Sequence, residues 1–166
     1  MKKLNKKPTA HLICGFIGSG KSIFAKKLEK ETGAVRFTKD EWMIRIFGHN
    51  PQKIDGFKKY DERMTKLTTD VALECVNAGH DVVIDDGFWF KSQREEIYNQ
   101  ITELGANYLL YYIKCPDEVG KNRALQRSKN PSKDSFIIDE DMYNFYKKYF
   151  EAPSGGEKFI LIDTNN

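Results

Sequence analysis

The segment that most constrains this chain runs from Gly15 to Ser22 and has the sequence GFIGSGKS. It satisfies the pattern G-x-x-x-x-G-K-[ST] in full, follows the short apolar stretch Ala10–Cys14, and opens an amphipathic stretch, Lys21–Glu31. A strand followed by a helix is the context that a phosphate-binding loop needs. Glycines let successive backbone N–H groups converge on phosphate oxygens, and the helix N-terminus adds positive potential. The segment therefore predicts binding of a nucleoside triphosphate.

Every residue of this loop is a predicted nucleotide contact. The contacts are Gly15, Phe16, Ile17, Gly18, Ser19, Gly20, Lys21 and Ser22. The Lys21 ammonium is expected to reach the β- and γ-phosphates, which makes it a predicted catalytic residue. The Ser22 hydroxyl is expected to ligate Mg²⁺. The expected cofactors are ATP and Mg²⁺.

The rest of the chain alternates between strand-like and helix-like segments. Strands are predicted at 10–14, 34–37, 81–85, 107–114 and 159–163, and helices between them at 21–31, 38–47, 54–77, 92–105, 116–127 and 139–150. This alternation predicts an α/β fold with a parallel five-stranded sheet and helices on both faces. In such sheets ligands bind at the carboxyl ends of the strands, where the segments below also fall.

Length and composition narrow the class of protein. The 166 residues fit one domain, predicted at 9–166 after a lysine-rich tail at 1–8. No apolar run approaches the roughly 20 residues that span a bilayer, and the tail lacks the apolar core of a signal peptide. A cytoplasmic protein without a membrane partner is expected. The three cysteines form no C-x-x-C pair, which disfavours a zinc site, and the net charge of +3 lies mostly in the tail.

Two other classes of phosphate-loop protein fit the sequence poorly. A GTPase needs a base-reading N-K-x-D segment, but Thr38-Lys39-Asp40-Glu41 ends in Glu and lies too early in the chain. A D-x-x-G switch is also missing after the third strand, where Asp85 is followed by Asp86, Gly87 and Phe88. An AAA-type motor needs a longer chain than this one.

Carboxylates follow two of the predicted strands. Asp40 lies in the first turn of the helix after strand two, where the Thr38-x-x-Glu41 spacing predicts a capping box. An ionised Asp40 facing the phosphate loop could accept a proton from an attacking hydroxyl. Asp85 ends strand three and is expected to hold magnesium-bound waters or the acceptor. Asp86 fits this role or simple turn chemistry with Gly87.

Arg123 and Arg127 lie four residues apart on one face of a predicted helix, just before the polar segment 128–136. Guanidinium groups suit phosphate oxygens, and a cation on a closing segment stabilises charge in the transition state. Both arginines are predicted catalytic and nucleotide-binding residues on a lid at about 123–138. A merely solvated basic face, with Lys121 and Lys129, is the competing interpretation.

Four further side chains are predicted to contact the acceptor together with Asp40. Trp42 and Trp89 follow two strand ends, where an aromatic ring could stack on the acceptor or pack into the core. Arg45 and Arg94 lie on neighbouring helices and could bind acceptor anions. A second capping box is predicted from Ser92 to Glu95.

The sequence resembles the small P-loop kinases of the AAA_33 / zeta-toxin-like family, relatives of polynucleotide kinases and chloramphenicol phosphotransferase. The resemblance covers nearly the whole chain and rests on GFIGSGKS, FTKDEW, VVIDDGFW, RALQRSKN and YFEAPSGGE. It implies a nucleoside-kinase-like sheet of order 2-3-1-4-5, Mg-ATP as donor and a hydroxyl acceptor. It also implies that Asp40 is the base, that Asp85 is the strand-three acid, and that Arg123 and Arg127 are the lid arginines. Segment 150–157 would lie near the adenine.

The sequence departs from this family at one position. Many relatives have an arginine three residues after the base, where this chain has Met43. The departure disfavours a nucleic-acid acceptor, and so does the nearly neutral domain surface. The expected function is phosphoryl transfer from ATP to a hydroxyl of a small molecule. Two alternatives stay open: an RNA or DNA 5′-hydroxyl kinase, and a nucleotide-gated or toxin-like partner-binding protein. The sequence leaves the oligomeric state open.

Overall fold

The computed structural model describes residues 6–50, 53–131 and 135–165. The strands are β1 (Thr9–Cys14), β2 (Val35–Thr38), β3 (Val82–Gly87), β4 (Asn107–Lys114) and β5 (Ile160–Asp163). The helices are α1 (Lys21–Thr32), α2 (Lys39–Phe47), α3 (Phe57–Asn77), α4 (Lys91–Glu103), α5 (Asp117–Lys129) and α6 (Glu140–Lys147). Most of the predicted tail, residues 1–5, and part of the predicted lid, residues 132–134, lie outside the described residues.

The five strands form one parallel sheet in the order β2-β3-β1-β4-β5. The predicted fold class and strand order are therefore confirmed. The register aligns Thr38 of β2 with Asp85 of β3, and Cys14 of β1 with Gly87 of β3. The residues that follow β1 and β2 thus emerge at the same edge of the sheet as the carboxylates at the end of β3.

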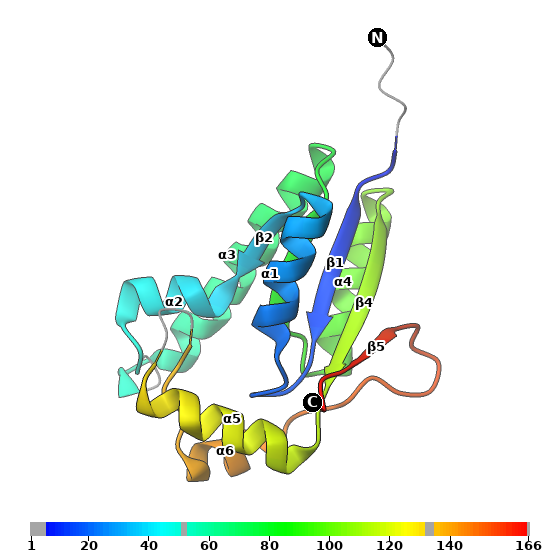
Figure 1. The fold of residues 1–166 in the computed structure, drawn as a ribbon. Coiled ribbons are helices and arrows are strands. Elements are labelled where there is room, and N and C mark those ends of the chain that lie inside the picture. Colours follow the sequence, from blue (N-terminus) through cyan, green and yellow to red (C-terminus); the bar gives the residue numbers. More distant parts are fainter. Residues whose placement is uncertain (1–5, 51–52, 132–134, 166) are drawn as a thin grey trace.

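Helices cover both faces of the sheet (Figure 1). One face packs against α1 through a buried cluster that includes Ala25, Leu28 and Ile113. The other packs against α3 and α4, where Ala72, Val76, Ile97 and Ile101 meet strand residues. β1 and β3 lie inside the sheet, and their apolar stretches Leu12–Cys14 and Val82–Ile84 are buried, as expected for strands that are covered on two faces. None of the described helices is both long and apolar enough to cross a membrane.

Helices α5 and α6 lie across the carboxyl ends of the strands (Figure 1). They pack on the phosphate loop through a third buried cluster, formed by Phe16, Ala124, Ile138 and Tyr143. At the start of α6, the Asp139 carboxylate caps the helix by accepting a hydrogen bond of 2.8 Å from the backbone N–H of Met142. This cluster fixes the loop between the sheet below it and the helices that cover it.

Two predicted capping boxes are wrong in detail. Thr38 does precede α2, but its hydroxyl accepts a hydrogen bond from Arg36 and does not cap the helix. Helix α4 begins at Lys91, one residue before the predicted cap Ser92. There the Gln93 side chain accepts a hydrogen bond of 3.2 Å from the N–H of Phe90. At α2 a competing side-chain contact thus replaces the local motif, whereas at α4 a capping contact of the same kind forms two residues earlier than predicted.

Candidate active site

The phosphate loop connects β1 to α1, as its sequence predicts. Gly20 precedes α1 in the left-handed conformation, with φ of 97°, which costs a glycine little and other residues more. Gly18 has φ of 78°, and a Cβ placed there would lie 2.0 Å from the backbone oxygen of Gly120 on α5. The loop therefore needs glycine at this position both for its backbone and for its approach to α5.

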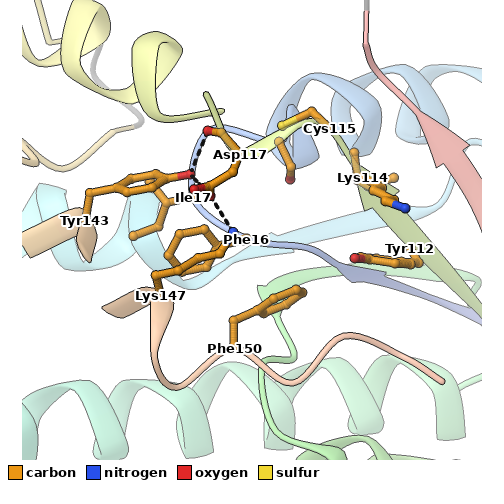
Figure 2. A pocket seen from close by; sticks show the side chains of 11 residues that line it. Phe16, Ile17, Tyr112, Lys114, Cys115, Asp117, Tyr143, Lys147 and Phe150 are labelled. Carbon is orange, nitrogen blue, oxygen red and sulfur yellow. Dashed lines mark hydrogen bonds and ion pairs between the residues drawn. The ribbon is translucent and has the colours of Figure 1, made fainter. Parts of the chain in front are cut away.

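The outer side of the loop is held by aromatic rings. Phe16 lies with its ring centroid 5.2 Å from Trp89, 5.0 Å from Tyr143 and 5.6 Å from Phe150. Figure 2 shows Phe16, Tyr143 and Phe150 around a pocket of about 40 Å³. This volume has room for a few water molecules. The rings around it pack on the phosphate loop.

Lys21, in the first turn of α1, faces the carboxylates at the sheet edge. Its ammonium donates a hydrogen bond of 2.9 Å to the backbone oxygen of Phe16, which arches the side chain back over the loop. Burial lowers the pKa of Lys21, and the charges of Asp85 and Asp40 oppose that shift. A lysine held over the loop in this way is placed to meet phosphate oxygens.

Asp85 is 5% exposed and lies at the end of β3. Burial raises its pKa to about 6, against the opposing effects of the Lys21 charge and a hydrogen bond with Ser22. Its Oδ2 atom is buried and has no hydrogen-bond partner. An orphaned buried carboxylate oxygen beside a serine hydroxyl fits a divalent cation, which prefers oxygen ligands.

The described residues contain no group of three or more His, Cys, Asp or Glu side chains that could enclose a metal ion. Mg²⁺ commonly retains several waters and binds through one or two protein oxygens together with the phosphates of a substrate. Ser22 and Asp85 match this sparse arrangement.

Asp40 lies in the first turn of α2. This helix follows β2, the strand that pairs with β3, which carries Asp85. Burial raises the pKa of the Asp40 carboxyl, while the charges of Lys39 and Lys21 act in the opposite direction. The helix N-terminus further favours the ionised form. Asp40, Asp85 and Lys21 influence one another electrostatically, so the structure brings these three predicted residues together.

Three further charged residues lie beside Asp40, and of these the sequence analysis considered only Asp86, as an alternative to Asp85. The Lys39 ammonium lies 3.1 Å from a carboxylate oxygen of Asp61 on α3 and 3.2 Å from one of Asp86 on β3. Burial would lower the pKa of Lys39, but Asp86, Asp61 and Asp40 together raise it. Lys39 and Asp86 are sequence neighbours of predicted site residues. Asp61 lies within a long helix, where its spacing carries no signal.

The two predicted lid arginines, both on α5, have different environments. Arg127 is exposed, and its charge acts on both Lys21 and Asp40. Arg123 donates hydrogen bonds to Thr164, of 3.2 Å to the hydroxyl and 2.8 Å to the backbone oxygen. The Thr164 hydroxyl in turn donates to the backbone oxygen of Ser19 at 2.7 Å. Arg127 thus faces the carboxylates, whereas Arg123 connects α5 to the chain after β5 and to the phosphate loop.

Arg94 is not a free anion-binding group, contrary to the prediction for it. It is 1% exposed, and its guanidinium forms a bidentate pair with Glu157 at 2.6 and 2.9 Å. The remaining nitrogen, Nη1, donates to the backbone oxygens of Phe88 and Glu151 at 2.9 and 3.0 Å. The Arg94–Glu157 pair therefore holds segment 150–157 against the start of α4, which is a structural role.

The other predicted acceptor contacts differ in their placement. Trp42 packs edge-on against Phe37, with centroids 6.2 Å apart, and joins the core on the α3 and α4 face. The core-packing interpretation thus holds for Trp42. Trp89 lies 5.9 Å from the ring of Tyr146 and stays a candidate contact. Arg45 is exposed in the last turn of α2 and also stays a prediction.

The fold is shared with solved structures of kinases. A putative kinase from Chloroflexus aurantiacus superposes with a TM-score of 0.77 at 15% identity, over 96% of this chain and 90% of that one. A gluconokinase from Sinorhizobium meliloti superposes with a TM-score of 0.68 at 15% identity, over 97% of this chain and 85% of that one. At these identities the likeness establishes the fold alone.

Sequence comparison gives a relative and a family. The chain is 26% identical over 113 residues to an L-seryl-tRNA(Sec) kinase of Methanococcus maripaludis. The match covers 64% of this chain and only 41% of the length of that relative. Residues 11–153, which include the phosphate loop and both predicted lid arginines, match the AAA_33 family, described as an AAA domain. The predicted resemblance is thereby confirmed, and the chain belongs to the AAA_33 family.

Proposed function

We propose that this chain transfers the γ-phosphoryl group of Mg-ATP to a hydroxyl of a small-molecule acceptor. The observation that carries the proposal is the convergence of Lys21, Asp40 and Asp85 at one edge of the sheet, next to a complete phosphate loop. A cation, a base and a metal-compatible acid are the parts that phosphoryl transfer requires.

The phosphate loop would bind the triphosphate through its backbone N–H groups and the N-terminus of α1. Lys21 would leave the Phe16 carbonyl, 2.9 Å away, for the β- and γ-phosphates. Bound Mg²⁺ neutralises phosphate charge, and Ser22 and Asp85 would hold it. Arg127 would approach from α5 and stabilise the charge on the transferring phosphoryl group.

Asp40 would act as the base on the acceptor hydroxyl. As the acceptor oxygen forms its bond to the γ-phosphorus, the bond to the β–γ bridging oxygen breaks and ADP departs. The hydroxyl proton passes to the Asp40 carboxylate. Because Lys39 and Lys21 oppose the effect of burial, they help to keep that carboxylate ionised and ready to accept the proton.

The test measures ADP release from Mg-ATP across a panel of small hydroxyl compounds, with RNA and DNA 5′-hydroxyl oligonucleotides in separate wells. Asp40→Asn is expected to retain ATP binding and to lower turnover by about 10²–10⁴-fold, the usual contribution of a general base. The exposed Asp70, which pairs with Lys66 on α3, supplies the control variant Asp70→Asn. Full turnover by Asp40→Asn would contradict the assignment of the base.

A nucleic-acid acceptor is the second candidate, favoured by the similarity to a kinase of seryl-tRNA(Sec). It predicts activity in the oligonucleotide wells or on aminoacylated RNA, with affinity that falls steeply as salt increases. If no well released ADP while a thermal-shift assay still showed Mg-ATP binding, the result would instead favour a nucleotide-gated partner-binding protein.

A further inference from the structure

Thr164, the residue directly after β5, joins β4, the phosphate loop and α5. Its backbone N–H donates a hydrogen bond of 2.8 Å to the backbone oxygen of Lys114, which extends the pairing of β4 with β5. Its hydroxyl donates to the backbone oxygen of Ser19 at 2.7 Å. The Arg123 guanidinium donates to the hydroxyl of Thr164 at 3.2 Å and to its backbone oxygen at 2.8 Å. The end of β5 is thus tied both to the phosphate loop and to α5 (Figure 1).

The Thr164 hydroxyl has a single proton, and the distances show where that proton is directed. The Ser19 oxygen lies 2.7 Å from the hydroxyl and the Lys114 oxygen 3.3 Å, so the stronger hydrogen bond goes to the phosphate loop. A guanidinium can only donate, so Arg123 uses a lone pair of the same hydroxyl oxygen. A cation that donates to a hydroxyl polarises it and strengthens the hydrogen bond that the hydroxyl donates in turn. Arg123 therefore acts on the loop through Thr164.

The hydrogen bond from Thr164 fixes the orientation of one peptide unit of the phosphate loop. The bond between Ser19 and Gly20 is trans, so its C=O and its N–H point in opposite directions. Because Thr164 holds the oxygen, the Gly20 N–H points away from Thr164. Gly20 directly precedes α1, and the first N–H groups of a helix have no partner within the helix. In a phosphate loop these N–H groups meet the phosphate oxygens.

This peptide unit needs such a restraint because it lies next to a glycine. Gly20 has φ of 97°, and a glycine can leave that conformation for others of similar energy. A half-turn of the peptide unit would direct the Ser19 oxygen, the negative end of the carbonyl dipole, to the side where phosphate binds. The Thr164 side chain lies directly against this unit, since a Cβ placed on Gly20 would be 3.8 Å from the Thr164 methyl carbon.

We propose that Thr164 is a positioning residue for nucleotide binding, whose hydroxyl holds the Ser19–Gly20 peptide so that the Gly20 N–H faces the phosphates. This inference rests on the nucleotide-binding part of the proposed function. It also assigns different tasks to the two arginines of α5. Arg123 acts on the nucleotide through Thr164, whereas Arg127 approaches the transferring phosphoryl group itself. A residue after β5 thereby determines how the loop after β1 presents its donors.

The test measures the dissociation constants of Mg-ATP and Mg-ADP by isothermal titration calorimetry, so that it needs no acceptor. Thr164→Val replaces the hydroxyl by a methyl group and is expected to weaken both nucleotides about tenfold or more, the effect of losing one hydrogen bond to a charged group. Thr164→Ser retains the hydroxyl and should bind both nearly as the unmodified protein does. Thr102→Val, which removes a hydroxyl that donates to the Tyr98 oxygen within α4, is the matched control and should change neither affinity.

Two results would overturn the role of the hydroxyl. One is unchanged affinity in Thr164→Val, and the other is an equal loss in Thr164→Val and Thr164→Ser, which would assign the effect to packing of the methyl group. Circular dichroism of the nucleotide-free variants verifies the fold. Weaker binding by Thr164→Val in a protein that transfers no phosphoryl group would support this inference while contradicting the proposed function. Failure of the unmodified protein to bind Mg-ATP would contradict both.

A second variant tests whether Arg123 acts through Thr164. Arg123→Met removes the guanidinium and keeps a long apolar side chain. It is expected to weaken Mg-ATP and Mg-ADP by a smaller factor than Thr164→Val, and to add little when the two changes are combined. Losses that multiply in the double variant would show that Arg123 contacts the nucleotide independently, and would overturn the path through Thr164.

Discussion

Two groups of buried charges lie in this domain, and they differ in how completely they are satisfied. The first is the pair of Arg94 and Glu157, in which the guanidinium donates to two carboxylate oxygens and two backbone oxygens. The second, around Lys39 and Lys21, contains buried oxygens of Asp85 and Asp86 that receive no hydrogen bond. Both groups lie close to the carboxyl ends of the strands.

The difference separates a structural role from a functional one. A buried ion pair whose donors are all used fixes geometry, and it leaves nothing to bind a ligand. A cluster with unsatisfied carboxylates is poorly stabilised by the protein alone and gains stability when a cation or donor arrives. Composition alone would not make this distinction, because both groups contain a basic residue and acids.

The largest expected effect tests whether the buried charges around Lys39 and Lys21 belong to a site of phosphoryl transfer. Arg127→Ala is expected to lower kcat by about 10³-fold or more, the effect of losing an arginine that stabilises a transferring phosphoryl group. Arg123→Ala, the matched change one turn earlier, breaks the contacts to Thr164 and should mainly raise KM for ATP. Steady-state kinetics on both variants, with circular dichroism as a folding control, decides the matter. Equal effects on kcat would remove the distinction between the two arginines.

The second expected effect is on stability. Arg94→Met leaves Glu157 buried without its partner, which costs about 3–5 kcal/mol of the free energy of unfolding in comparable pairs. Adding Glu157→Leu should recover part of that loss, since a hydrophobic pair leaves no uncompensated charge. Urea denaturation of the single and double variants measures both values. If Arg94→Met left the free energy of unfolding unchanged, the pair would not be what holds segment 150–157 against α4.

Much of the site follows from the order of residues along the chain. Asp40 and Asp85 were predictable because each follows a strand, and parallel strands bring their carboxyl ends to one edge. The phosphate loop was predictable because its glycines and lysine have fixed spacing. Lys39 and Asp86 lie next to these residues, but their side chains could equally have pointed to solvent.

The remainder depends on contacts distant in sequence. Arg94 was predicted to bind acceptor anions, and nothing local shows that Glu157, 63 residues later, would pair with it. Asp61 lies in α3, and the helical period shows which face of that helix it occupies. The period does not show which strand end that face meets. Such pairings require the packing of α3 and α4 on the sheet to be known.

The third prediction concerns the dependence of the protein's stability on pH. The pKa of Asp85 is raised by burial from 3.8 to about 6, so the folded protein binds a proton that the unfolded chain has released. The stabilisation is present below pH 3.8 and is lost as pH rises through about 6, by up to about 3 kcal/mol. Asp85→Asn should flatten this dependence and stabilise the nucleotide-free protein at pH 7.5. Denaturation from pH 4 to pH 8 measures both effects.

The same Asp85→Asn variant should lose much of the stabilisation that Mg-ATP gives to the protein. A gain in intrinsic stability combined with a smaller thermal shift on adding Mg-ATP would be the signature of a carboxylate kept for its ligand. A variant that is less stable at pH 7.5 would instead show that Asp85 belongs with the satisfied, structural charges.

The smallest expected effect comes from an ion pair outside both groups. Lys66 and Asp70 are one turn apart on α3, and their ammonium and carboxylate meet at 3.0 Å, with side chains 77% and 51% exposed. Lys66→Gln should change the free energy of unfolding by no more than about 0.5 kcal/mol, because water and salt screen such pairs. Its distance resembles those at Lys39 and is longer than the shortest at Arg94. A loss approaching that of Arg94→Met would mean that proximity of charges, and not their burial and satisfaction, decides what a charge contributes in this fold.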